Sequence, residues 1–249
     1  FTDADKNTAV GTNALSSDTL GSKSVAVGTA ALFTQNFTTA TDGLNTAVGF
    51  EAGKGITTGI QNTMVGGLAG DALTTGGANV AIGYSALSAE DTGNRNVAVG
   101  NFALTAQNNH ATNNNTAVGY GAGSTINTGI QNTLIGADSG DALTTGSRNT
   151  IIGYNNSASA VGGQDQVVIG NGTNSAGNDT AAIGGDAGRC FIGLDGSDTS
   201  WGADSDERLK KDIQDATVGL SFINDLRPVT YKWKAKNEID NSFPRYDAD

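Results

Sequence analysis

The chain has 249 residues, of which 36 are glycine and only two are proline. The glycine share is about twice the usual 7 %, but no G-X-Y period is present, which excludes collagen. Aromatic residues make up 6 % and charged residues 16 %, with a net charge of −11. So few large side chains argue against one big globular core. An acidic chain without a basic stripe is also a poor ligand for nucleic acid or anionic membranes.

Cysteine usage and hydropathy restrict the class further. A lone cysteine, Cys190, cannot form a disulfide within the chain, and we expect it to be a small buried hydrophobe. No apolar run reaches the ~18 residues of a membrane span, and no signal peptide is visible. We therefore expect no membrane insertion, and the sequence predicts neither a cofactor nor a metal site.

A five-residue block of the type Asn-Thr-Ala-Val-Gly dominates the first two hundred residues. The block ends on a closing glycine, and the copies end at Gly11, Gly28, Gly49, Gly66, Gly83, Gly100, Gly119, Gly136, Gly153, Gly170, Gly184 and Gly193. Most spacings are 17 residues; those at 28–49 and 100–119 are longer, and the last two are shorter. A second period of 70 residues, four units, relates 56–76 to 126–146. Such a fixed period is typical of a repeat architecture.

Each block is predicted to be one short strand. The fourth position is Val or Ile, and the second is mostly Thr or Val; in a strand these two share a face. The glycine permits a bend. Three residues later a small residue returns, which implies close approach of another backbone: Ala14, Ala31, Ala52, Ala69, Ala86, Ala103, Ala122 and Ser139.

One 17-residue unit cannot bury its own apolar face, whereas stacked units can. We therefore predict an all-β fold, a β-helix or β-roll solenoid of ~17-residue coils with one rung every ~4.8 Å. Each buried Val or Ile would contribute about 1.5–3 kcal/mol. A lone chain would leave its apolar stripe exposed to solvent, and rungs shared among partner chains would cover it. Hexapeptide, calcium-binding nonapeptide, leucine-rich and ice-binding solenoids fit the pattern less well.

Two features within the units are predicted beyond the strands. The longer intervals should be surface loops, of which the first contains Phe33 and Phe37 and the second contains His110. The asparagines that begin the blocks could form stacked amide ladders.

The repeat resembles two related families. Asn-Thr-Ala-Val-Gly units with alanine three residues later are similar to the head repeats of trimeric autotransporter adhesins and to shafts of phage tail fibres. The resemblance covers about 7–193. It implies that three chains wrap together as a homotrimer.

Composition changes near Ser197, beyond which both Trp, both Pro and most basic residues lie. We divide the chain into a repetitive shaft at 1–196, a linker at 197–204 and a short α+β segment at 205–249. Helical spacing of apolar residues predicts a helix over 217–226, ended by Pro228. Alternation predicts a strand over 229–234.

The C-terminal segment resembles the start of the intramolecular chaperone domain of endosialidases and other phage tail fibres. The matching motifs are Ser-Asp-x-Arg-Leu-Lys-x-x-Ile at 205–213 and Leu-x-x-Ile-x-x-Leu-x-Pro-Val-x-Tyr-x-Trp at 220–233. That family trimerises, guides the shaft into register and cuts itself off. The resemblance implies a dyad of Ser205 and Lys210, with the scissile bond at Asp204–Ser205 or Ser205–Asp206. Family domains continue with long helices, so we expect the domain here to be truncated.

The dyad has a chemical rationale and a plain alternative. A serine hydroxyl becomes nucleophilic when a neighbouring base takes its proton, and a lysine can be that base if burial lowers its pKa. Most serines and lysines, however, simply face solvent. On that alternative Ser205 caps a turn and Lys210 is solvated.

Other chemistry has little support. His110 has no partners for a triad or a metal site, and we expect it at a solvated loop tip. Oxygen ligands for calcium could come from an acidic cluster: Asp195, Asp198, Asp204 and Asp206. No phosphate loop is present. Carboxylates from adjacent chains could meet for glycoside hydrolysis, but nothing singles out a pair.

Three functions remain, in order of preference. The first is a structural phage tail fibre in the virion, a trimeric shaft for host attachment with a self-releasing chaperone. The second is a bacterial trimeric adhesin at the cell surface, and the third is a tailspike glycan depolymerase. The expected partners are further copies of the chain, a host receptor or glycan, and other tail proteins. Any enzymatic activity would be at most one self-cleavage.

Overall fold

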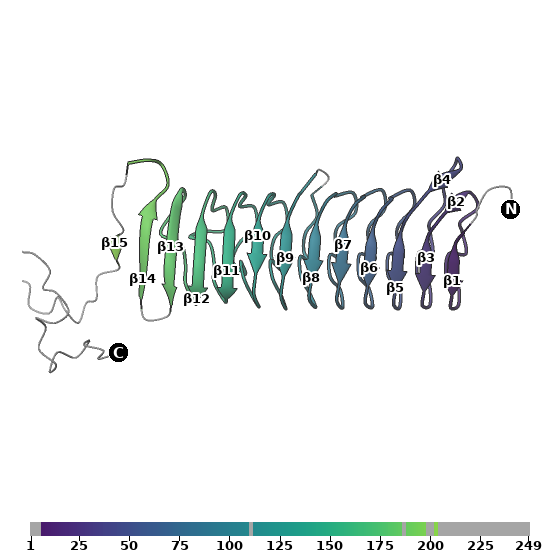
Figure 1. Ribbon diagram of the computed structural model, residues 1–249, viewed down its shortest axis with the longest axis horizontal. Helices are drawn as coiled ribbons and strands as arrows, with labels where there is room; N and C mark the ends of the chain where they lie inside the picture. The colour runs from purple at the N-terminus through teal and green to yellow at the C-terminus, as the bar shows by residue number, and fades with distance from the viewer. Residues whose placement is uncertain (1–5, 110–111, 186–187, 198–201, 204–249) are drawn as a thin grey trace, which may run out of the picture. The chain divides into compact units, whose positions relative to one another are not determined.

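The computed structural model describes residues 6–109, 112–185, 188–197 and 202–203. The chain divides into two units, residues 1–204 and 205–249, and the described residues all lie in the first. They form an all-β solenoid, as predicted (Figure 1). The described part contains no helix, and hence none long and apolar enough to span a membrane.

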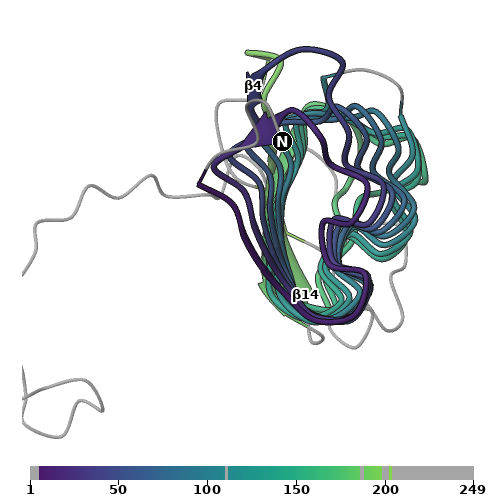
Figure 2. The same ribbon diagram turned by 90° about the vertical axis from the view of Figure 1, so that its right-hand side faces the viewer.

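One long sheet runs the length of the solenoid, with its strands hydrogen-bonded in chain order. Its strands are β1 (Thr8–Val10), β3 (Val25–Val27), β5 (Thr46–Val48), β6 (Thr63–Val65), β7 (Val80–Ile82), β8 (Val97–Val99), β9 (Thr116–Val118), β10 (Thr133–Ile135), β11 (Thr150–Tyr154), β12 (Val167–Asn171), β13 (Thr180–Gly185), β14 (Gly188–Gly193) and β15 (Gly202–Ala203). The eleven from β1 to β13 pair in parallel, which gives ten steps from coil to coil. Seen along the solenoid, the coils lie one behind another (Figure 2).

Pairing joins identical positions of successive blocks. Thr46 pairs with Thr63, and Val48 pairs with Val65. The 17-residue period therefore sets the register, because one turn of the solenoid brings the chain to the equivalent position of the next block.

From β3 to β13, the third residue of each block lines the interior, whereas Ala9 in β1 is exposed. These residues are fully buried: Ala26, Ala47, Met64, Ala81, Ala98, Ala117, Leu134, Ile151, Val168 and Ala182. The second and fourth residues do share a face, but it is the outer face. The expectation that stacking alone buries the Val and Ile side chains is therefore wrong for a single chain. A three-residue strand turns one side chain in and two out. The interior residue is alanine in most coils and a larger residue in others, such as Met64 and Leu134.

The closing glycines allow the coils to approach at the bend. Gly66 has a φ of 132°, and a Cβ there would lie 2.5 Å from the carbonyl oxygen of Gly83. Only glycine fits such a backbone contact. The small residues three positions later are also part of a ladder, since the N–H of Gly53 donates to the carbonyl of Ala69 at 2.9 Å. Ala69 is fully buried, as the close backbone approach predicted.

A pair of positions four and seven residues after each closing glycine, the inner pair, fills the rest of the interior. Leucine at the first position accompanies a polar residue at the second: Leu15/Asp18, Leu32/Gln35, Leu87/Glu90 and Leu104/Gln107. Glycine accompanies an aliphatic residue: Gly53/Ile56, Gly70/Leu73, Gly123/Ile126 and Gly140/Leu143. A Cβ on Gly53 would lie 3.0 Å from Ile56 Cδ1, so the two positions share one volume. Two coils with leucine at the first position are followed by two coils with glycine there. This four-coil pattern then repeats, which accounts for the 70-residue period.

The first long interval contains a small sheet and a buried ring. In this sheet β2 (Gly21–Ser22) pairs with β4 (Thr41–Asp42) in parallel. Lys23 Nζ contacts Asp42 Oδ2 at 2.5 Å on its surface. Phe37 is 5 % exposed, so this ring is core rather than part of a solvated loop. His110, in the second interval, lies outside the described residues.

The repeat ends differently from the sequence expectation. β14 pairs with β13 in antiparallel orientation, so the block copy that ends at Gly193 is a returning strand and not a further coil. Cys190 lies on β14 and is exposed, which corrects the prediction that it is buried. The positions in β14 no longer repeat the inward and outward pattern of the coils, because the chain has reversed direction.

The inner pair predicts compensation between two substitutions. Glu90→Ile alone should overpack against Leu87, and Leu87→Gly alone should leave a cavity, each costing about 2–4 kcal/mol. The double variant reproduces the Gly53/Ile56 combination, in a coil whose strand also carries an interior alanine, Ala81. We expect urea denaturation to show a coupling of at least about 1 kcal/mol between the sites. Strictly additive losses would contradict the shared volume.

Candidate functional site: the outer face of the sheet

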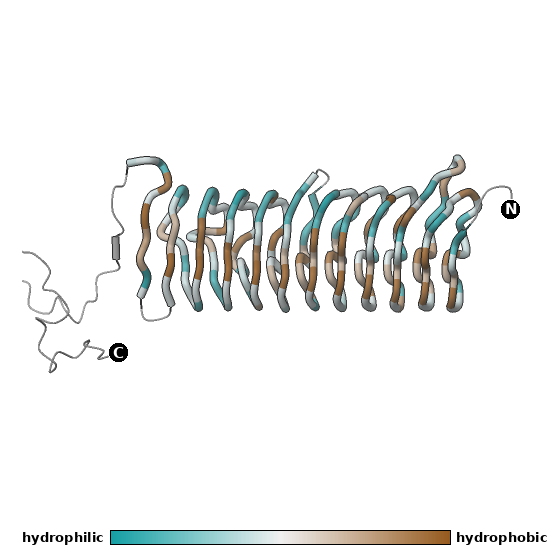
Figure 3. Tube along the Cα trace, viewed as in Figure 1, coloured by the Kyte–Doolittle hydropathy of each residue, from teal (hydrophilic) through white to brown (hydrophobic). Residues whose placement is uncertain are grey.

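The outer face consists of the second and fourth block residues of the parallel strands. Its second positions are Thr, Val or Ala and its fourth positions are Val or Ile, so it carries no charge. Many fourth-position side chains are exposed, at 37 % for Val48, 38 % for Ile82 and 48 % for Ile183. Hydrophobic residues recur at the same height in successive coils (Figure 3).

The outer face exposes apolar side chains along the whole length of the parallel sheet. Single exposed apolar residues are normal on a protein surface, whereas contiguous apolar patches mark interaction sites. Here exposed Val and Ile side chains recur on seven of the eleven parallel strands, from Val10 in β1 to Ile183 in β13, and those on the other four strands are half-buried. The outer face therefore has the chemistry of a protein–protein interface.

Buried asparagines hold the start of each strand in place. The N–H of Asn62 donates to Asn45 Oδ1 at 2.9 Å, and Asn62 Nδ2 donates to the carbonyl of Gly76 at 2.9 Å. Asn79 continues the chain of contacts by donating its N–H to Asn62 Oδ1 at 3.0 Å. The predicted ladder is confirmed, and it includes Asn45, Asn62, Asn79, Asn96, Asn115, Asn132 and Asn149. A one-residue slip would break these bonds and turn the outer face inward.

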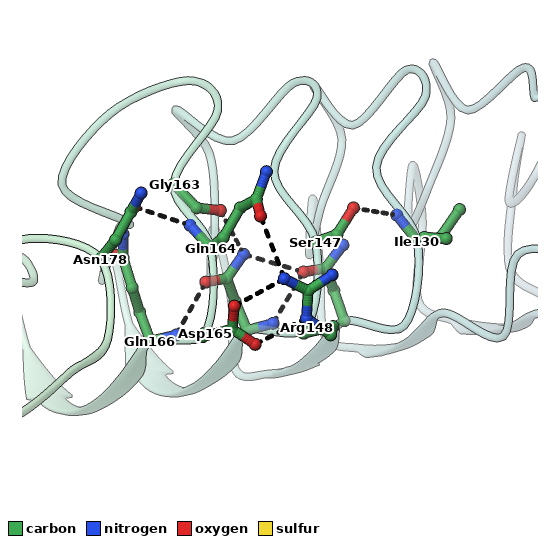
Figure 4. A network of polar contacts seen from close by, with 10 residues as sticks. Ile130, Ser147, Arg148, Gly163, Gln164, Asp165, Gln166 and Asn178 are labelled. Carbon is green, nitrogen blue, oxygen red and sulfur yellow. Dashed lines mark hydrogen bonds and ion pairs between the residues drawn. The ribbon is translucent and has the colours of Figure 1, made fainter. Parts of the chain in front are cut away.

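Figure 4 shows where the asparagine ladder gives way to glutamine. The N–H of Gln166 donates to Asn149 Oδ1 at 3.1 Å, and its longer side chain donates to Asn178 Oδ1 at 3.1 Å.

Outside the ladder, Arg148 makes two 2.6 Å contacts with the carboxylate of Asp165. The guanidinium lowers the pKa of Asp165. Both side chains lie at the surface, 49 % and 37 % exposed, so the ion pair adds little to the stability of the fold.

The polar inner-pair residues connect to the same ladder in the two long coils. Gln35 Oε1 accepts from Asn45 Nδ2 at 2.8 Å, and Gln107 Oε1 accepts from Asn115 Nδ2 at 3.1 Å. In these coils the glutamine Oε1 takes the place of the asparagine Oδ1 that accepts the equivalent hydrogen bond in a regular 17-residue coil. The insertions are thus accommodated by buried amides.

A carboxylate is sealed inside the fifth coil. Glu90 is fully buried, with Oε1 accepting from the N–H of Gly93 at 2.7 Å and Oε2 from Asn113 Nδ2 at 2.6 Å. The N–H of Asn109 lies 3.4 Å from Oε2. Burial raises the pKa of Glu90, and the hydrogen bonds oppose that rise without cancelling it. Because the side chain is enclosed, it can stabilise the fold but cannot reach a substrate.

The residues singled out from the sequence are only partly placed. Ser205, Lys210, Asp204 and Asp206 lie outside the described residues, as do Asp198 and the predicted elements 217–226 and 229–234. Asp195 is described, and its Oδ1 accepts from the N–H and Oγ of Ser197. No cluster of three or more His, Cys, Asp or Glu suited to a metal occurs among the described residues.

Sequence reasoning missed two features. Glu90 was not distinguished from surface carboxylates, although it occupies the position that is Leu73 or Ile56 in other coils. The aromatic residues directly after some closing glycines were also overlooked. Aligning all coils on the closing glycine would have shown both.

Glu90 predicts a specific pH dependence. Its folded pKa lies above the ordinary 4.5, so the native state binds more protons than the unfolded chain as the pH rises above that value. Its stabilising contribution is full below 4.5 and is lost as pH rises through the folded pKa. We expect the unfolding free energy of wild type, relative to Glu90→Gln, to fall with rising pH in urea titrations. The surface variant Asp141→Asn is the control, and a pH-independent difference for Glu90→Gln would contradict the prediction.

The comparisons with known proteins concern the C-terminal segment. Comparison with curated proteins and with solved structures gives no match. A family model described as the chaperone of endosialidase matches residues 205–246. The chain therefore combines a β-solenoid with a C-terminal segment similar to the endosialidase chaperone, as the sequence motifs predicted.

Proposed function

We propose that this chain is the shaft of a trimeric phage tail fibre that attaches the virion to its host. The observation that carries the proposal is the uncharged outer face, which follows the solenoid across its parallel strands. Further copies of the same chain are the natural partners, because an identical repeat presents its contacts at an identical spacing. The trimeric number follows from the resemblance of both the repeat and the chaperone segment to trimeric families.

The energetics favour assembly along the whole length. Covering the exposed part of each of the seven exposed fourth-position Val and Ile side chains contributes about 0.5–1 kcal/mol, or on the order of 4–7 kcal/mol per chain. Association has a substantial entropic cost, so a short stretch would not suffice. Assembly should therefore be cooperative along the shaft.

The chaperone segment gives the shaft a means of finding its register. Every rung offers the same contacts, so three chains could associate with any offset of whole rungs. A domain that brings the C-terminal ends together first would remove that ambiguity. This role, and release through Ser205 and Lys210, are proposed from the family match at 205–246.

The alternatives have less support. A bacterial adhesin would share the repeat, but the endosialidase-chaperone match favours a tail fibre. A depolymerase needs a pair of accessible carboxylates, and Glu90 cannot belong to such a pair because it is enclosed.

Charge on the outer face should prevent assembly. The double variant Ile82→Lys/Val118→Lys places two cations on an interface where a buried unpaired charge is strongly unfavourable. We expect light scattering to give the mass of three chains for wild type and of one chain for the variant. Val161→Lys, at an exposed apolar residue outside the sheet, is the matched control and should remain trimeric. A wild type that is monomeric at all concentrations would contradict the proposal.

The dyad predicts cleavage in the complete gene product. Wild type should split next to Ser205, while Ser205→Ala and Lys210→Ala remain intact, because one lacks the nucleophile and the other the base. Denaturing gels and mass spectrometry of the fragments provide the measurement. Lys211→Ala is the neighbouring control and should cleave normally. An intact wild type, or cleavage of Ser205→Ala at the same bond, would exclude the dyad.

A further inference from the structure

From the third coil onward, one row of residues on the solenoid is aromatic in every second coil. The row, called here the ring row, consists of the residues directly after the closing glycines from Gly49 to Gly170: Phe50, Gly67, Tyr84, Asn101, Tyr120, Ala137, Tyr154 and Asn171. The first two coils carry Thr12 and Thr29 at this position. Its four aromatic members are between 48 % and 58 % exposed. Between them stand small or polar residues. The alternation is therefore a regular pattern of exposed rings along the shaft.

The spacing of the rings is fixed by the backbone. The carbonyl of Tyr84 accepts from the N–H of Phe102, and the carbonyl of Tyr120 accepts from the N–H of Asp138, at 2.9 and 2.8 Å. Equivalent bonds join the other row residues to the following coil. Successive aromatic residues are two rungs apart, about 9.6 Å. That distance is close to the length of one extended disaccharide.

The rings are supported from the side. Phe102 lies between two members of the row, with its ring centroid 5.5 Å from Tyr84 and 5.9 Å from Tyr120, edge to face in both cases. A Cβ on Gly67 would lie 3.6 Å from Tyr84 Cδ2, so the tyrosine ring leans over this glycine. Coils five to seven thus present a continuous aromatic strip, Tyr84–Phe102–Tyr120, on a rigid scaffold.

Polar groups suited to hydroxyl ligands accompany the strip. Asn101 Oδ1 accepts from the N–H of Tyr84, which fixes the amide beside the rings. Within the described part of the chain, no hydrogen bond involves Asn101 Nδ2 or the phenolic oxygens of Tyr84 and Tyr120. The strip therefore combines flat apolar surfaces with donors available to a ligand.

We propose that the ring row binds an extended, uncharged glycan, with one ring for each disaccharide of the polymer. Sugar rings have flat C–H faces that pack on aromatic rings, and their hydroxyls can meet Asn101 and the phenols. Flat nucleic-acid bases would also stack, but the net charge of −11 and the carboxylates of Glu51 and Asp138 beside the row repel polyanions. This inference rests on the proposed role in host attachment and names the ligand class for it.

Affinity electrophoresis of the full chain tests the proposal. The probes are native gels containing hydroxyethylcellulose, as a neutral glycan with an extended disaccharide repeat, or polygalacturonate, as an anionic one. We expect hydroxyethylcellulose to retard wild type and polygalacturonate to have no effect. The triple variant Tyr84→Ser/Tyr120→Ser/Tyr154→Ser should bind at least about tenfold more weakly, since it removes three flat apolar surfaces on which sugar rings would pack. Tyr84→Phe should retain most of the retardation, and Val161→Ser is the exposed apolar control.

Light scattering on the same samples separates this inference from the proposed assembly. Loss of retardation with an unchanged oligomeric state supports the ring row as the glycan site. A triple variant that falls apart into single chains would show that the rings belong to the interface between copies, and would overturn the inference. A trimeric wild type without retardation would also overturn it while leaving the shaft intact. Retardation of a monomeric wild type would support the ring row and contradict the trimer.

Discussion

Hydrogen bonding in register between successive coils is the constraint on which the rest of this structure depends. Each strand pairs with the next at identical block positions, and each closing glycine packs its backbone on the following one. A side chain at Gly66 would collide with the carbonyl of Gly83. The coils must therefore share one shape, and the sequence can vary only where that shape leaves space.

The interior is narrow, and its volume is divided among a few positions. Alanine or a modest aliphatic residue occupies the strand position, and the inner pair exchanges leucine and a polar residue for glycine and an aliphatic one. Close packing makes such exchanges coupled rather than independent. The buried carboxylate of Glu90 and the amides of Gln35 and Gln107 each accept a hydrogen bond from an asparagine of the following coil.

The same narrowness places Val and Ile outside. A strand of three residues has one interior position, so the second and fourth block residues, which are mostly Thr, Val and Ile, face outward in a single chain. The outer face is therefore apolar and partly exposed to solvent. Tyr84 and Tyr120 follow the closing glycines, just beyond the ends of β7 and β9.

The sequence by itself determined the repeat length, the strands, the glycine bends and the asparagine ladder, because period and residue type are local properties. It also identified the segment at 205–246 by its motifs. The tertiary structure alone decided which face of each strand is interior, since two alternate faces are equivalent until the turn closes. It also decided that β14 reverses, that Cys190 is exposed and that Glu90 is enclosed, because each of these depends on contacts between residues of different coils.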